Sequence, residues 1–115
     1  MLRKKSECKV EERVAMRNGP GTVLIRNIAS RDELYDKARM FGVITLNKDC
    51  GIGYHEHHNE SEIFCIQKGK AIYRDDDKEY EVSEGDVVIC EDGHGHGIRN
   101  ENEDACEFMA LIVLK

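Results

Sequence analysis

Short apolar runs separated by turn residues fill the chain from Met40 onward, and this pattern most constrains the fold. Glycine, aspartate and asparagine stand between the runs, and almost no stretch has the periodicity of an amphipathic helix. Many short strands divided by turns are typical of an all-β sandwich or barrel. The clearest predicted strands are residues 41–46, 63–66, 71–74, 79–82, 87–90 and 108–114.

The first 36 residues predict an N-terminal arm and an edge strand, within the same domain as a barrel over residues 37–115. Charged residues dominate up to Met16, and residues 18–21 (Asn-Gly-Pro-Gly) are a strong turn signal. Residues 22–28 are rich in β-branched side chains and predict a strand.

A capping-box pattern follows that strand. Ser30 stands three residues before Glu33, the spacing at which each side chain satisfies the backbone N–H of the other residue. The pattern predicts one short helical turn through Leu34 and Tyr35.

Composition narrows the classes of partner. The chain has 115 residues, enough for one domain, and carries 23 acidic against 17 basic residues for a net charge of −6. An acidic surface argues against nucleic acid, and no apolar run reaches membrane length. With no signal peptide and five widely spaced cysteines, we expect free thiols in the cytoplasm and no membrane partner. Cys65 and Cys90 lie inside apolar runs and are expected to act as small hydrophobic residues.

Two histidines one residue apart carry the chemistry of the first motif. Side chains two apart on a strand share a face about 6.6 Å apart along the chain, so His55 and His57 project together while Glu56 points away. Glu62 begins the apolar run that contains Phe64 and Ile66. A carboxylate on an inward face is costly unless it is paired or binds a cation.

A third histidine, His96, follows Gly93 and Gly95 far downstream. Together with His55, His57 and Glu62 it predicts a site for one divalent metal ion inside the barrel, with manganese, iron, nickel and zinc as the candidates. An alternative is that these histidines are hydrogen-bonded core residues without a metal. His58 and His94 have polar or glycine neighbours and are expected in exposed loops.

The two motifs resemble those of small single-domain cupins. The first cupin motif is roughly G-x5-H-x-H-x3,4-E-x6-G, matched here by His55, His57, Glu62 and Gly69. The second is roughly G-x5-P-x-G-x2-H-x3-N, and its matching residues are Gly85, Gly93, His96 and Asn100. Two positions depart: Glu91 replaces the proline, and the first glycine falls at Gly51 and Gly53, whereas strict spacing would use Asp49.

The resemblance implies a jelly-roll β-barrel, a homodimer, and His55, His57, Glu62 and His96 as metal ligands. It does not select a reaction, because cupins include dioxygenases, decarboxylases, isomerases and non-catalytic binding proteins. We expect a metal-dependent enzyme acting on a small polar molecule, with a non-catalytic ligand-binding barrel as the alternative.

A general acid or base beside the metal would favour the enzyme. Tyr54, Tyr73 and Arg99 are the candidates, although strand alternation turns Tyr54 and Arg99 away from the metal ligands. An apolar mouth would favour the binding protein instead. Such a mouth would consist of Phe41, Phe64, Ile66 and Met109.

Overall fold

The computed structural model describes all 115 residues and contains ten strands and two short 3₁₀ helices. In chain order the elements are η1 (Lys5–Glu7), β1 (Val10–Val14), η2 (Met16–Asn18), β2 (Thr22–Asn27), β3 (Ala38–Leu46), β4 (Cys50–Glu56), β5 (Glu60–Lys68), β6 (Lys70–Asp75), β7 (Lys78–Ser83), β8 (Val87–Cys90), β9 (Gly95–Asn100) and β10 (Cys106–Leu114).

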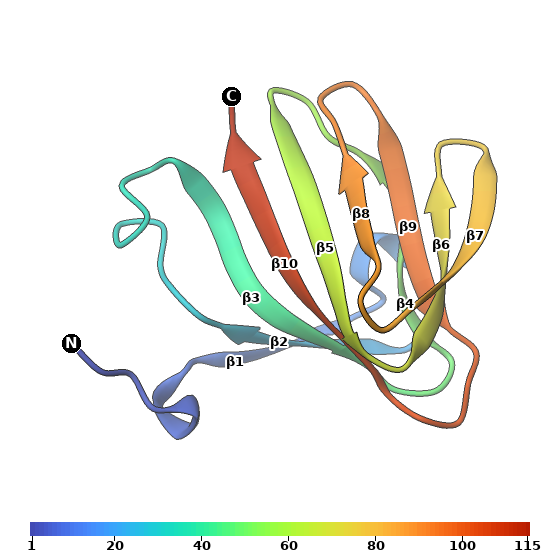
Figure 1. Ribbon diagram of the computed structural model, residues 1–115, viewed down its shortest axis with the longest axis horizontal. Coiled ribbons are helices and arrows are strands. Elements are labelled where there is room, and N and C mark those ends of the chain that lie inside the picture. The colour runs from blue at the N-terminus through green and yellow to red at the C-terminus, as the bar shows by residue number, and fades with distance from the viewer.

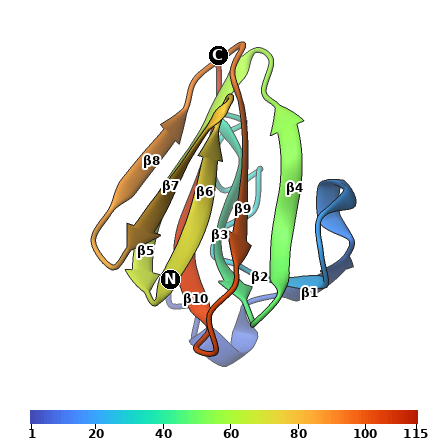
Figure 2. The same ribbon diagram turned by 90° about the vertical axis from the view of Figure 1, so that its right-hand side faces the viewer.

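Two antiparallel sheets face each other across the core (Figures 1 and 2). The first has the order β1-β2-β3-β10-β5-β8 and the second β4-β9-β6-β7. Strands β3 to β10 form the eight-stranded double sheet of a jelly roll, as the sequence predicted. Strands β1 and β2 extend the first sheet beyond β3 at the lower left of Figure 1.

Alternation along each strand decides which side chains enter the core. On β5, Glu62, Phe64 and Ile66 are buried, whereas their neighbours Ile63 and Cys65 are less so. This confirms that the acid shares the inward face with the apolar row. The largest cluster of buried residues is Val23, Ile25, Ile44, Leu46, Ile52, Phe64, Ile66, Ala71, Tyr73, Val82, Ile98, Cys106, Phe108 and Ala110.

The predicted strands are all present, and most are longer than their apolar runs. The short turn expected after Ser30 is present, because residues 31–36 form hydrogen-bonded turns in which the Leu34 amide donates to the Ser30 carbonyl oxygen at 3.1 Å, and it does not extend into a helix. The capping hydrogen bonds do form: the Glu33 amide donates to Ser30 Oγ at 3.2 Å, and the Ser30 amide donates to Glu33 Oε1 at 2.9 Å. Tyr35 and Asp36 then adopt positive φ angles of 53° and 55°, which stop the helix after one turn.

The five cysteines are all free, as predicted. Cys90 is 1% exposed, and burial raises its pKa to about 12, so this thiol is an inert core group, as expected. None of the helices is long and apolar enough to cross a membrane. The homodimer and the division of the chain at residue 36 stay predictions.

Candidate metal centre

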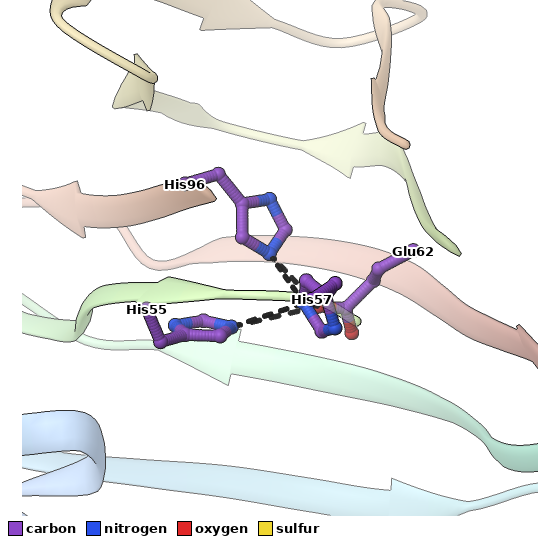
Figure 3. A group of neighbouring side chains, drawn as sticks. All are labelled: His55, His57, Glu62 and His96. Atoms are coloured by element: carbon purple, nitrogen blue, oxygen red, sulfur yellow. Dashed lines mark hydrogen bonds and ion pairs between the residues drawn. The ribbon is translucent and has the colours of Figure 1, made fainter. Parts of the chain in front are cut away.

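Four side chains, three on strands and one directly after a strand, converge at one end of the core (Figure 3). His55 lies near the end of β4, His57 directly follows that strand, Glu62 is on β5 and His96 is on β9. His55 and His96 are paired neighbours across the β4–β9 ladder. The prediction that these four residues lie close together is confirmed. One potential ligand atom from each lies within 4.8 Å of all the others.

The ligand atoms stand at short and similar separations. His57 Nε2 lies 3.2 Å from His55 Nε2, 3.1 Å from His96 Nε2 and 3.1 Å from Glu62 Oε1. Glu62 Oε1 lies 3.0 Å from His96 Nε2 and 3.9 Å from His55 Nε2. His57 and His96 are both 1% exposed, so solvent reaches the group mainly from the side of His55, whose side chain is 9% exposed.

Each imidazole is held from behind through its Nδ1 atom. His55 Nδ1 lies 2.8 Å from the carbonyl oxygen of Gly53, and His57 Nδ1 lies 2.6 Å from Glu60 Oε2. His96 Nδ1 lies 2.8 Å from the Tyr73 hydroxyl. Such partners fix the orientation and tautomer of histidines that bind metals. The three Nε2 atoms are thereby left facing one another.

These partners decide where the ring protons lie. A carbonyl oxygen and an ionised carboxylate only accept hydrogen bonds, so Nδ1 of His55 and of His57 must donate. In the neutral rings both Nε2 atoms then carry lone pairs, which point at each other and at the Glu62 carboxylate. Acceptors packed this closely repel unless a positive charge lies between them. The chemistry of the donor set therefore fits a cation.

The separations also fit one ion. Bonds of about 2.1 Å place neighbouring ligands of an octahedral ion about 3 Å apart. Three imidazoles and one carboxylate suit manganese, iron, nickel or zinc, and they leave open positions on an octahedral ion.

Electrostatics link the same groups to outer residues. Hydrogen bonding to Glu62 and to Glu60 raises the pKa of His57, against the opposing effect of burial. Burial lowers the pKa of His96. For Glu62, burial works to raise the pKa, but the imidazoles of His55, His57 and His96, when they are protonated, outweigh this effect and lower the pKa.

Glu60 links His57 to the positively charged side chain of Arg39. The guanidinium of Arg39 donates two hydrogen bonds of 2.7 Å to the Glu60 carboxylate, which also accepts from His57. This Arg39 pair, with the His57 bond, lowers the pKa of Glu60 to about 2. The carboxylate is thus kept ionised behind His57, and sequence reasoning missed it because Glu60 occupies one of the unspecified positions between His57 and Glu62 in the cupin motif.

A cavity of about 130 Å³ opens beside the ligand atoms. Its size suits a ligand of only a few heavy atoms, since drug-sized ligands need roughly 300 Å³ or more. None of the four residues whose apolar mouth would favour a binding protein lines this cavity. The lining residues are Glu11, Arg13, Met16, Arg17, Asn27, Arg39, Met40, Ile44, Ile52, His55, His57, Glu62 and Ile112.

The mouth is polar because the N-terminal arm supplies it. Glu11, Arg13, Met16 and Arg17 come from β1 and η2, which lie far from the motifs in sequence. A sequence pattern could not place them there, because their position depends on how β2 carries the arm back across the barrel.

The other candidate residues lie away from the cavity. His58 and His94 are exposed, as predicted, and pair with Glu56 and Asp76 at the surface. Tyr54 packs under Arg74, whose guanidinium carbon lies 4.0 Å from the ring centroid. Arg99 forms ion pairs with Glu79 and Glu101, and Tyr73 lies behind His96.

The remaining motif positions shape turns. Gly69, Gly85 and Gly93 have φ angles of 79°, 94° and 87°, in the left-handed region that favours glycine. Asn100 is fully buried and donates from Nδ2 to the carbonyl oxygens of Leu46 and Asp104, both at 2.9 Å. These residues carry the sequence signal without touching the ligand atoms.

Comparison with known families matches residues 42–113 to the cupin domain. The chain belongs to the cupin family. The match covers both motifs and all four candidate ligand residues, so this cupin's converging histidines lie where the family pattern sets them.

Two comparisons lead to Thermotoga maritima. A curated relative from that organism, named oxalate-binding protein, is 32% identical over 114 residues, covering 99% of this cupin and 94% of the relative. A crystal structure of a T. maritima protein described as a predicted oxalate decarboxylase superposes with a TM-score of 0.95. It is 32% identical, with all of both chains covered.

A more distant neighbour shares the fold alone. The cupin domain of Schizosaccharomyces pombe Cnp3 has a TM-score of 0.72 at 14% identity, and the match covers 81% of this cupin and 61% of that chain.

Proposed function

We propose that this cupin binds one divalent metal ion through His55, His57, Glu62 and His96, and that it holds a small carboxylate of the oxalate class beside that ion. The observation that carries the proposal is the set of facing nitrogen and oxygen atoms, 3.0 to 3.2 Å apart, in which hydrogen bonds to Nδ1 fix the tautomers of His55 and His57. Manganese, iron, nickel or zinc would satisfy these ligands. A bound metal supplies a Lewis acid that orients a chelating anion.

The cavity supports the choice of ligand class. Its small volume suits a ligand of a few atoms, and three arginines contribute to its wall in a protein that is acidic overall. A planar carboxylate matches the fork of a guanidinium group. The relative named oxalate-binding protein, similar over nearly the whole chain, points to the same class.

Elemental analysis and calorimetry test the proposal together. Protein purified without an affinity tag is analysed for metals, then stripped with a chelator and reloaded with manganese. We expect one ion per chain, and we expect oxalate to bind the loaded protein and not the stripped protein. Metal content near zero that manganese, iron, nickel and zinc all fail to restore contradicts the proposal, as does equal oxalate binding by both forms.

Turnover of the bound ligand is a second candidate, favoured by Glu11 in the cavity wall. Asn27 Nδ2 donates to the Glu11 carboxylate at 2.8 Å, and this hydrogen bond lowers the Glu11 pKa. An ionised carboxylate suits a general base better than an acid. Decarboxylation of monoprotonated oxalate would release carbon dioxide and formate in equal amounts. Formate assays of the metal-loaded protein and of Glu11→Gln test this candidate, and no formate above a protein-free control contradicts it.

A further inference from the structure

The turn between β1 and β2 has an unusual backbone. Three of its four residues at positions 15–18, here called the arm turn, have positive φ angles although none is glycine: Ala15 at 51°, Arg17 at 52° and Asn18 at 61°. Each such residue costs roughly 1 kcal/mol or more and persists only where surrounding contacts enforce it. Strain of this kind is concentrated at ligand-binding and active sites.

Close packing against β4 enforces the arm turn. A Cβ atom on Gly53 would lie 2.0 Å from the carbonyl oxygen of Arg17, and one on Gly19 would lie 2.5 Å from the Gly53 nitrogen. Figure 2 shows η2 beside β4. The glycine at position 53, which departs from strict motif spacing, therefore admits the arm turn two residues before His55.

The same glycine connects the arm turn to the centre. The Gly53 carbonyl oxygen accepts the hydrogen bond that orients His55. Backbone hydrogen bonds hold the arm turn itself, from the Ala15 amide to Gly21 at 2.9 Å and from the Asn18 amide to Ala15 at 3.0 Å. The Arg17 backbone is thus fixed at the edge of the cavity that contains the metal ligands.

Arg17 differs from the other two arginines of the cavity. Arg13 pairs with Glu11 at 3.2 Å, and Arg39 pairs with Glu60 at 2.7 Å. Arg17 forms no ion pair and is exposed. It therefore provides the free positive charge in the cavity wall, in a chain whose net charge is −6.

We infer that Arg17 is a specificity-determining residue that binds the carboxylate oxygens of the ligand facing away from the metal. The inference rests on the proposed function and adds that this cupin selects dianions over monoanions of the same shape. A charge-assisted hydrogen bond to the second carboxylate strengthens with the ligand's charge. An uncharged carboxamide at that place would lose most of this energy.

Calorimetry on manganese-loaded protein with oxalate and oxamate tests the inference, because oxamate replaces one carboxylate with an amide. We expect the wild type to prefer oxalate, and Arg17→Ala to weaken oxalate binding by roughly tenfold or more while weakening oxamate binding less. Arg17→Lys keeps the charge and should retain part of the preference. Arg26→Ala is the matched control, since Arg26 also forms no ion pair but lies outside the cavity. It should match the wild type.

Three outcomes would overturn the inference. An unchanged preference for oxalate over oxamate in Arg17→Ala would remove the role of Arg17 and leave the proposed function standing. If Arg17→Ala lost as much affinity for manganese as it lost for oxalate, the side chain would serve the fold of the site and not ligand recognition. A wild-type protein that binds manganese but not oxalate would remove the proposed ligand class, and the inference with it.

Discussion

His57 directs its Nε2 atom at Glu62 Oε1 from 3.1 Å, although the bond from its Nδ1 atom to Glu60 leaves no proton on Nε2 in the neutral ring. The lone pair of His57 Nε2 therefore faces the Glu62 carboxylate in a site from which solvent is largely excluded. A proton on His57 relieves the repulsion in the metal-free protein, and a metal ion held as proposed would relieve it for all four side chains together. The contact links metal binding, protonation and stability.

Removing the His57 side chain should abolish tight metal binding. His57 Nε2 lies within 3.2 Å of an atom of each of the other three side chains, so His57→Ala removes a candidate ligand and the shared centre of the group. Manganese titration followed by calorimetry measures the loss. His58→Ala is the control, because that neighbouring ring is exposed and should be dispensable. Unaltered affinity in His57→Ala would mean that another group supplies the ligand.

Neutralising Glu60 should weaken metal binding without removing a ligand. Glu60→Gln deprives His57 Nδ1 and Arg39 of their shared carboxylate, and loss of such an outer partner typically lowers metal affinity about 10- to 100-fold. Glu56→Gln provides a matched change at an exposed carboxylate that contacts only His58. Equal affinities for these two variants would argue that Glu60 serves the surface ion pair alone.

The strands and the four candidate ligand residues could be predicted from the sequence, because both depend on the spacing of residues close together in the chain. Alternation places Glu62 inward with Phe64, and H-x-H spacing places His55 and His57 on one face. Glycines with left-handed φ angles mark the turns that bring His96 to them.

The residues of the cavity wall could not be predicted from the sequence, because several of them come from the N-terminal arm, which is far from the motifs along the chain. Nothing local to Arg17 indicates that its carbonyl packs against Gly53, or that its own φ angle is positive. The capping box at Ser30 is local by contrast, since its hydrogen bonds form as the spacing predicted and positive φ angles at Tyr35 and Asp36 end the turn.

Metal affinity should fall as the solution becomes more acidic. Free histidine has a pKa of about 6.5, and hydrogen bonding to Glu62 raises the pKa of His57 in the metal-free protein. A raised pKa means that protons compete for His57 already above that pH, so affinity declines through neutral pH and more steeply below it. Manganese titrations in non-chelating buffers between pH 8 and pH 4 measure this. Constant affinity across the range would contradict histidine ligation.

Tyr73→Phe should destabilise the protein through His96. The Tyr73 hydroxyl is the hydrogen-bond partner of His96 Nδ1 in the core, and its loss leaves a buried polar atom unsatisfied at a cost of about 1–3 kcal/mol. Urea unfolding measures the change. Tyr80→Phe is the control, because Tyr80 is paired with Tyr73 across the β6–β7 ladder but is half exposed. Similar midpoints for both variants would count against a positioning role for Tyr73.

Removing the metal should lower the melting temperature of the protein, because a bound ligand stabilises the folded state. A ligand present at 1,000 times its dissociation constant stabilises the folded state by about 4 kcal/mol, which for a domain of this size corresponds to a shift of roughly 10 °C or more. The shift arises at the ligand residues, where the ion replaces repulsion between His57 and Glu62 with attraction to both. Scanning calorimetry of loaded and stripped protein measures it. The same comparison in His57→Ala should give almost no shift, and an undiminished shift there would place the stabilising ion elsewhere on the molecule.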